Sequence, residues 1–381
     1  MNNKTKLMSW LLLTVLLLLM AGCGRNDNSS VPDSGSKAES PYSIQYAKCF
    51  SIEYLADQVK VVTDGEGRRL LLLPKGQTAP EGYSGLEVIE TPVRDVMYDS
   101  TTQVGMLEAL GDEAIYDSIK VVTTPASDWD IEPIVKELEE GTIQFLENNY
   151  ETGLDIEQVQ LAKPALVFSN LGDQTGVALR AKLEELGIPY VSDGANLETT
   201  EEGNLEWIKF FAAFYNLDAE ADAFFKQSLE TIDSLAEKAA SAPEKPVVAE
   251  AMVFDGKVYI NGGQSATAKK IERAGGIYAF AGIEGDGNMT ITMEEFLDKA
   301  KDADILLYSS LIQYMPDKQT LLDTEPLLKE FKAVQEDQVW VLAKDFYMAS
   351  AGLAEKFQDL VMILHPELKA APELLHYEKL R

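Results

Sequence analysis

After Pro92 the sequence alternates short apolar runs with helical segments, and this alternation is interrupted only once. Alternation of this kind predicts an α/β architecture with mostly parallel sheets. Before the interruption we expect strands at 93–98, 119–123, 165–169 and 188–191, and helices at 101–110, 154–162 and 177–186. After it we expect strands at 247–254, 258–260, 305–308 and 339–342, and helices at 266–274, 293–300 and 352–364.

The interruption lies between about residues 204 and 241, where apolar residues follow helical spacing throughout. A helix over 218–239, with Asp218 as its N-cap, would be about 33 Å long at 1.5 Å per residue, which is enough to brace two lobes. The fold class that follows is α/β, with two Rossmann-like lobes joined by one long backbone helix and a ligand cleft between the lobes. We expect an N-terminal lobe at 46–200, connecting helices at 201–243 and a C-terminal lobe at 244–381. The N-terminal lobe should open with a β-hairpin around the turn 64–67.

The N-terminus has the features of an export signal. Lys4 and Lys6 precede an apolar run over residues 8–20, which is shorter than the roughly 20 residues that a membrane span needs. The sequence Leu19-Met20-Ala21-Gly22-Cys23 resembles a bacterial lipobox, in which the cysteine thiol receives the lipid. We therefore expect a signal peptide at 1–22, lipidation of Cys23 and a flexible tether at 23–45. The alternative is an ordinary secretory signal with a chance cysteine.

Charge and composition narrow the choice of partners. The chain has 63 Asp and Glu against 33 Lys and Arg, a formal net charge of −30, which disfavours binding to nucleic acid. Anionic headgroups would also repel the globular part, so contact with the membrane should depend on the lipid anchor. The chain holds only two His and two Cys, too few for a Cys/His zinc cluster. We expect no resident metal and no cofactor.

Several segments together resemble a known family. They are Leu161-Ala-Lys-Pro-Ala-Leu-Val-Phe168, residues 183–191, Ala274-Gly-Gly276 and His365-Pro-Glu-Leu368. In this order, and behind a lipobox, they resemble the substrate-binding proteins of ATP-binding-cassette importers for iron complexes and cobalamin. The resemblance implies a monomer that is lipid-anchored on the extracytoplasmic face of the cell membrane, captures a bulky iron chelate of the siderophore type, and delivers it to a membrane permease. A corrinoid or haem is the alternative cargo.

Ligand-contacting residues are expected after the carboxyl ends of the strands, where open α/β sheets bind their ligands. The candidates are Tyr98, Ser100, Trp129 and Asn170 in the first lobe, and Gln264, Ser265, Asn288, Tyr308, Ser309 and Tyr347 in the second. Each has a structural alternative, because Ser and Asn often begin turns and Tyr308 follows a buried run. No Arg falls clearly at such a strand end, which favours a neutral or cationic cargo unless Lys344 or Arg180 supplies positive charge.

The resemblance also implies that an acidic residue on each lobe meets basic residues of the permease. Glu294 matches the position in the second lobe, and Asp173 is the nearest residue in the first. The alternative for Glu294 is a favourable interaction with the positive end of its helix.

Other function classes lack support in the sequence. A lipid-anchored extracellular enzyme is one alternative, but no Gly-x-Ser-x-Gly, His-Glu-x-x-His or phosphate-loop motif occurs. A protein that binds bare zinc or manganese would normally use more His residues than this chain has. A lipid-anchored sensor that does not transport its ligand stays open.

Overall fold

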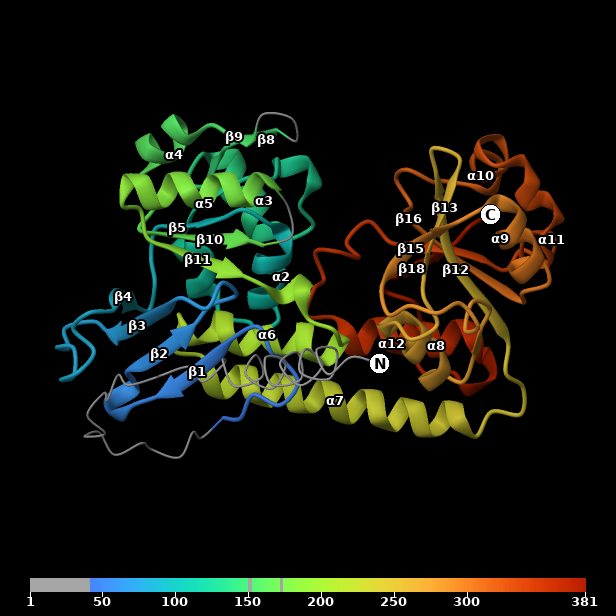
Figure 1. The fold of residues 1–381 in the computed structure, drawn as a ribbon, viewed down its shortest axis with the longest axis horizontal. Helices are drawn as coiled ribbons and strands as arrows, with labels where there is room; N and C mark the ends of the chain where they lie inside the picture. Colours follow the sequence, from blue (N-terminus) through green and yellow to red (C-terminus); the bar gives the residue numbers. More distant parts are fainter. Residues whose placement is uncertain (1–41, 150–152, 172–173) are drawn as a thin grey trace, which may run out of the picture.

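The computed structural model describes residues 42–149, 153–171 and 174–381. These residues form two α/β lobes that stand side by side over a layer of helices formed by α6, α7, α8 and α12 (Figure 1). The signal peptide, Cys23, most of the predicted tether and Asp173 lie outside the described residues. None of the helices in the described part of the chain combines the length and apolarity that a membrane span requires.

The first lobe contains a parallel five-stranded sheet in the order β11-β10-β5-β6-β7. Helices cover both of its faces, so alternate residues enter different cores: Val96 and Tyr98 face one core, and Met97 faces the other. The strands are β5 (Val96–Tyr98), β6 (Ile119–Val122), β7 (Gln144–Phe145), β10 (Leu166–Asn170) and β11 (Tyr190–Asp193), and the helices are α2 (Thr101–Glu108), α3 (Glu132–Glu140), α4 (Ile156–Ala162) and α5 (Gln174–Leu186). The short strands β8 (Asn148–Asn149) and β9 (Gly153–Leu154) pair with each other.

A separate four-stranded sheet precedes this lobe, in the order β1-β2-β3-β4. Its strands are β1 (Ser51–Tyr54), β2 (Lys60–Thr63), β3 (Arg69–Pro74) and β4 (Glu87–Thr91). β2 and β3 are antiparallel, with Thr63 opposite Arg69, so the predicted hairpin is confirmed. Val62 and Leu70 pack into the core of the first lobe, while Val61 and Leu71 form a small core on the opposite face.

The second lobe contains a mixed sheet in the order β15-β13-β12-β16-β17-β18, with β14 paired to the start of β12. β12, β16 and β17 are parallel, whereas β13, β15 and β18 run antiparallel to their neighbours. The strands are β12 (Val247–Phe254), β13 (Lys257–Asn261), β14 (Ile277–Tyr278), β15 (Asn288–Ile291), β16 (Ile305–Leu311), β17 (Val339–Leu342) and β18 (Tyr377–Lys379), and the helices are α8 (Ala266–Arg273), α9 (Met293–Ala300), α10 (Lys318–Thr324), α11 (Lys332–Gln335) and α12 (Leu353–Leu364).

Two helices lie between the lobes along the chain. α6 (Glu201–Ala213) is buried along almost its whole length in the core of the first lobe. α7 (Asp218–Ala240) has 23 residues and contacts both cores: Phe225 packs into the first, and Ile232 and Leu235 pack into the second. At 1.5 Å per residue it is about 34 Å long. The predicted two-lobed fold with a long bracing helix is thus the observed one.

The predicted N-cap of that helix is wrong. Asp218 is the first helical residue, and Leu217 stands at the cap without a side-chain hydrogen bond. The Asp218 carboxylate instead pairs with the buried Lys60 ammonium at 2.7 Å and accepts a hydrogen bond from the Tyr54 hydroxyl at 3.0 Å. Asp218 therefore forms a tertiary ion pair instead of capping the helix.

Candidate functional site

The central strand of the parallel sheet creates a crevice in the first lobe. The chain passes from β5 to β6 on one side and later returns to place β10 on the other side of β5. Such a reversal of strand order is a topological switch point, where loops diverge beyond the carboxyl ends of the strands. Ser100 follows β5 and Asn170 ends β10, so the two residues flank the crevice. Ser100 is held there by a capping box with Gln103 at the start of α2.

A groove extends from this crevice to the second lobe. One hollow, with a volume of about 270 Å³, is lined on the first-lobe side by Ser100, Thr102, Met106, Asn170, Asp193, Ala195, Asn196, Asn204 and Phe211, and on the second-lobe side by Phe346, Tyr347, Ser350 and Lys356. A second hollow of about 300 Å³ shares Asn204, Phe346, Ser350 and Lys356 and continues towards α8. This combination of aromatic and polar side chains at a boundary between lobes is typical of small-molecule sites.

The loop that follows β17 lies against the first lobe beside the groove. The Ser350 hydroxyl donates to the Thr102 carbonyl at 2.6 Å, and the Lys344 ammonium pairs with the Asp130 carboxylate at 2.9 Å. Gly105 in α2 faces the Met348 carbonyl so closely that a Cβ atom would lie 1.7 Å from its oxygen. Only glycine fits this approach, which brings Phe346 and Tyr347 to the groove.

Two carboxyl groups share one hydrogen-bond donor at the first-lobe wall, where Asp193 is part of the lining. The Gln103 Nε2 amide donates to Asp99 at 3.1 Å and to Asp193 at 3.2 Å. Burial raises the pKa of Asp99 to about 7, and Asp193 adds to this, while the backbone N–H of Asn170 acts in the opposite direction. Burial also raises the pKa of Asp193. This pair therefore holds the end of β10 and can retain a proton near neutral pH.

Lys356 supplies a positive charge to the groove. Its ammonium donates to the Ala349 carbonyl at 2.6 Å and lies 4.6 Å from the centre of the Phe346 ring. Burial, together with the nearby Lys270, lowers the pKa of Lys356 to about 8. In the part of the chain that the structure describes, no carboxylate lies within 4.0 Å of this ammonium. Glu201, Asp345 and Glu355 lie near enough to act against this lowering of the pKa, but none of them forms an ion pair with Lys356.

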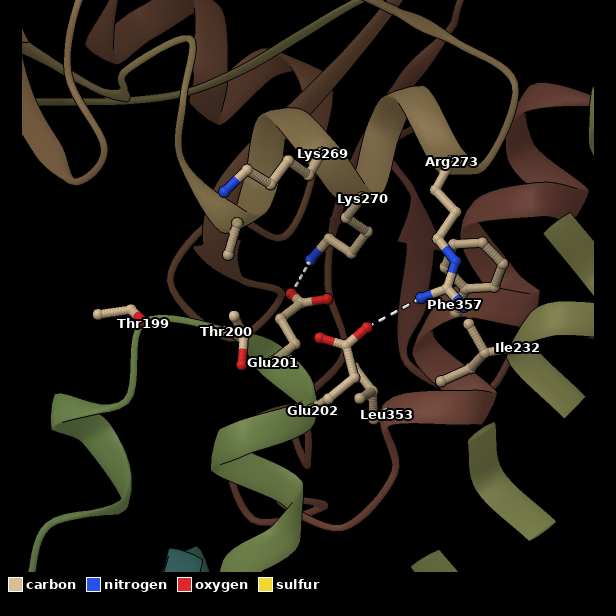
Figure 2. Close-up of a pocket in the computed structure, with 11 residues that line it drawn as sticks. Thr199, Thr200, Glu201, Glu202, Ile232, Lys269, Lys270, Arg273, Leu353 and Phe357 are labelled. Carbon is tan, nitrogen blue, oxygen red and sulfur yellow. Dashed lines mark hydrogen bonds and ion pairs between the residues drawn. The ribbon is translucent and has the colours of Figure 1, made fainter. Parts of the chain in front are cut away.

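A third hollow adjoins the groove between α6 and α8 (Figure 2) and shares Glu201 and Lys270 with the second hollow. Glu201 and Glu202 in the first turn of α6 face Lys270 and Arg273 on α8. The Glu201–Lys270 and Glu202–Arg273 pairs are each 2.9 Å long. Burial disfavours the charge on Lys270, but Glu201, Tyr377 and Glu250 together hold its pKa above the ordinary value. These pairs tie the two lobes together beside α7.

Comparison with known proteins defines the family. A family model described as "Periplasmic binding protein" matches residues 96–346, which cover most of both lobes. The chain belongs to this periplasmic binding protein family. Two lobes with a groove between them are the arrangement expected of a solute-binding protein of this family.

An uncharacterized lipoprotein of Methanocaldococcus jannaschii is 30% identical over 317 residues, covering 81% of this periplasmic binding protein and 75% of the relative. Two solved structures share the fold. A possible iron-binding (periplasmic solute-binding) protein from Staphylococcus epidermidis has a TM-score of 0.55 at 14% identity, covering 71% of this chain and 98% of that one. The periplasmic heme-binding protein RhuT from Roseiflexus has a TM-score of 0.53 at 15% identity, covering 72% and 98%.

The structure brings three of the predicted ligand residues together in the groove of this periplasmic binding protein. They are Ser100 and Asn170 from the first lobe and Tyr347 from the second. The Tyr347 side chain is 55% exposed, so its ring is available to a ligand. That these three residues contact a ligand stays a prediction.

Three other predicted residues are buried in the cores. The Tyr98 hydroxyl is hydrogen-bonded to the Tyr215 hydroxyl at 2.6 Å, and the Trp129 indole donates to the Thr124 carbonyl at 3.0 Å. The Tyr308 hydroxyl donates to the Val253 carbonyl at 3.2 Å. Their polar atoms are satisfied and their rings are at most 4% exposed, so the structure gives all three a packing role.

The remaining four predicted residues lie in the second lobe outside the groove lining. Gln264 accepts a hydrogen bond from the Gly285 N–H at 2.6 Å, and the buried Ser265 caps α8 by accepting from the Ala268 N–H at 3.1 Å. Asn288 is exposed at the start of the edge strand β15. Ser309 lies within β16 and its side chain is hydrogen-bonded to Glu250. In this structure these residues stabilise turns, helix ends and the sheet.

The two cations considered for the cleft have other partners. Lys344 pairs with Asp130, and the buried Arg180 pairs with Glu66 at 3.2 Å while donating to the Asn170 carbonyl at 3.0 Å. Sequence reasoning missed Lys356 and Lys270, because each lies inside a predicted helix whose orientation the sequence does not give. Asp193 could have been found, since it ends a strand that was predicted to stop two residues earlier.

The predicted docking residue Glu294 is exposed in the first turn of α9, next to the Thr292 cap. Its side chain is therefore accessible to a partner. Asp173, its counterpart in the first lobe, lies outside the described residues.

Proposed function

We propose that this solute-binding protein captures an iron chelate of the siderophore type outside the cytoplasm and delivers it to the permease of an ATP-binding-cassette importer. The observation that carries the proposal is the groove between the lobes, where Ser100 and Asn170 face Phe346, Tyr347 and Lys356. Aromatic rings offer a large contact area with few rotamers to freeze, and the polar side chains can orient an organic chelate.

The similar solved structures support a cargo that contains a metal. One is titled a possible iron-binding protein and another a heme-binding protein. Because these likenesses establish only the fold, the iron chelate is our proposal for this chain. Haem or a corrinoid is the alternative cargo for the same type of importer, and both would also use the aromatic residues of the groove.

We also propose that Cys23 carries a lipid that anchors the protein on the extracytoplasmic face of the cell membrane. The lipobox-like sequence before Cys23 and the lipoprotein name of the relative both support this. Mass spectrometry of the mature N-terminus tests it: a diacylglyceryl group on Cys23 is expected, and an unmodified N-terminus beyond Cys23 would contradict it.

The proposed delivery step needs a surface that meets the permease. Glu294 is exposed in the first turn of α9 and suits a basic partner, with Asp173 as the proposed counterpart in the first lobe. Import measured with a Glu294→Lys protein that still binds its cargo tests this role, and undiminished import would count against it.

A binding titration with a matched pair of tyrosine variants tests the proposed function. Tyr347 in the groove is 55% exposed and Tyr314 outside the groove is 72% exposed, so replacing either ring should not disturb folding. We expect at least one ferric chelate in a panel to bind with a Kd of about 1 μM or tighter. Tyr347→Ala should weaken that binding about tenfold, since it removes ring contact worth about 1.4 kcal/mol.

Tyr314→Ala should bind as the unaltered protein does. The panel contains ferric citrate, ferrichrome, hemin and cyanocobalamin, and isothermal titration calorimetry gives each Kd. Binding of hemin or cyanocobalamin alone would replace the iron chelate by the alternative cargo. An equal loss in both tyrosine variants, or no binding of any compound, would contradict the proposed function.

A further inference from the structure

We propose that the groove selects a cargo with an anionic oxygen group and that Lys356 is the residue that binds this group. The inference rests on the proposed function and specifies its substrate class. It differs from the expectation based on the scarcity of Arg at strand ends, which favoured a neutral or cationic complex.

The acidic residues of the groove already have partners. Glu201 pairs with Lys270 at 2.9 Å. Glu198 accepts hydrogen bonds from the Trp207 indole and from the backbone N–H groups of Lys48 and Cys49. Their negative charge is therefore balanced or directed away from the groove.

Asp193, the third acidic residue of the lining, is 1% exposed. It accepts from the Ala195 N–H at 2.9 Å and from Gln103 at 3.2 Å. Burial raises the pKa of Asp193, while the hydrogen bonds from Ala195 and Gln103 act in the opposite direction. Both carboxyl oxygens of Asp193 thus already accept hydrogen bonds from the first lobe.

The position of Lys356 suits an anion that enters from the groove. Lys356 lines both hollows where they meet, beside the neutral hydrogen-bonding residues Asn204 and Ser350. An ammonium group has three N–H donors, and the structure uses one of them on the Ala349 carbonyl. The Phe346 ring supports the ammonium from one side. The remaining donors can therefore bind a carboxylate, catecholate or phosphate oxygen of the cargo.

Burial makes such a contact stronger than it would be on the surface. The lysine loses hydration in the groove, and an ion pair in a low-dielectric environment is stronger than one in water. Hydrogen bonds between charged partners are also about twice as strong as neutral ones. An anionic group on the cargo would replace the lost hydration, whereas a cationic group would be repelled.

Titration of anionic and neutral chelates into charge variants tests the inference. The probes are ferric citrate, an anionic carboxylate chelate, and ferrichrome, a neutral hydroxamate chelate. We expect the unaltered protein to prefer ferric citrate and Lys356→Met to lose about 10- to 100-fold in affinity for it. Lys269→Met is the matched control, since Lys269 lines neither of the two groove hollows and its replacement should not affect binding.

A second measurement does not depend on the folding of a variant. Acetylation of the Lys356 amine in the unaltered protein, followed by mass spectrometry, should be slowed by ferric citrate, while acetylation of the exposed Lys182 should not change.

Tight binding of ferrichrome together with unimpaired binding of ferric citrate by Lys356→Met would overturn the anionic class and leave the proposed function standing. Binding of ferrichrome without binding of ferric citrate would also overturn the anionic class and leave the proposed function standing. Binding of neither probe would count against the proposed function and, with it, against the inference. Equal acetylation of Lys356 with and without ferric citrate would also overturn it.

Discussion

Asp99 is the residue whose surroundings most clearly link the groove to the fold. Its carboxylate accepts the backbone N–H of Asn170 at 3.0 Å and the side-chain amide of Gln103 at 3.1 Å. Gln103 also completes the capping box of Ser100. The Asp99 carboxyl group therefore fixes both first-lobe residues that flank the crevice. Whether it is protonated should change the free energy of unfolding.

The Asp99→Asn variant tests this link through pH. The pKa of Asp99 is about 7 in the folded protein against an ordinary value of 3.8, so the folded state binds more protons between about pH 4 and pH 7. Its contribution to the free energy of unfolding therefore falls as the pH rises through that window and is lost above about pH 7. Because Asn cannot ionise, the variant should gain in Tm relative to the unaltered protein as the pH is raised from 5 to 8.

Asp286→Asn, at an exposed position, is the control and should show no such trend. Differential scanning calorimetry at several pH values measures the difference. A Tm gap between Asp99→Asn and the unaltered protein that stays constant with pH would show that Asp99 does not titrate in this range.

The strand-end rule predicted some of the residues that line the groove, and it also selected residues that are buried in the cores. The strand-end rule identifies the edge of the sheet, but it does not say where a strand's buried part stops. Tyr98 is the last residue of β5 and faces the core of the first lobe, whereas Ser100 lies beyond the end of the strand. Lys356 reaches the groove from α12, and no strand-end argument points to a helical lysine.

Among the elements, α6 and α8 hold the lobes together beside α7. Glu201 and Glu202 of α6 face Lys270 and Arg273 of α8, and their side chains point towards one another across the hollow in Figure 2. The acidic residues also lie at the positive end of α6, where negative charge is favourable. The lobes are thus connected by ion pairs as well as by a continuous helix.

Glu201→Gln should weaken this connection. Lys270 is 13% exposed and Glu201 31% exposed, so their ion pair is partly shielded from water. Gln keeps the shape and one acceptor but removes the charge, and we expect the free energy of unfolding to fall by about 1–2 kcal/mol. Urea denaturation followed by circular dichroism measures the change.

Lys182→Gln is the control at the element scale, because the Lys182–Glu185 pair lies on the surface at 57% and 67% exposure. It should change the free energy of unfolding by no more than about 0.5 kcal/mol. A Glu201→Gln protein as stable as this control would mean that the pair between the lobes contributes nothing in solution.

The sequence predicted the long elements well and the short edge strands poorly. α7 and the strand β12 appear where their periodicity placed them. β14 and β18 have two and three residues and are held by pairing with β12 and β17. Such strands carry too few residues for a pattern and form only when a neighbouring strand is present.

The described part of the chain forms two lobes that share the long helix α7 and leave a groove between them. Membership of the periplasmic binding protein family accounts for this arrangement. The chain carries a net charge of −30, yet the groove presents Lys356. An anionic chelate would thus meet a local positive charge on an otherwise acidic protein, which favours specific binding in the groove over binding elsewhere.

The most direct test of this account is X-ray diffraction at the iron absorption edge from crystals of the protein saturated with the ferric chelate that binds most tightly. The account predicts one strong anomalous peak per molecule in the groove between the lobes, bordered by Ser100 and Asn170 on one side and by Tyr347 and Lys356 on the other. A peak on the outer surface of either lobe, or no ordered iron in a protein shown to bind the chelate, would contradict it.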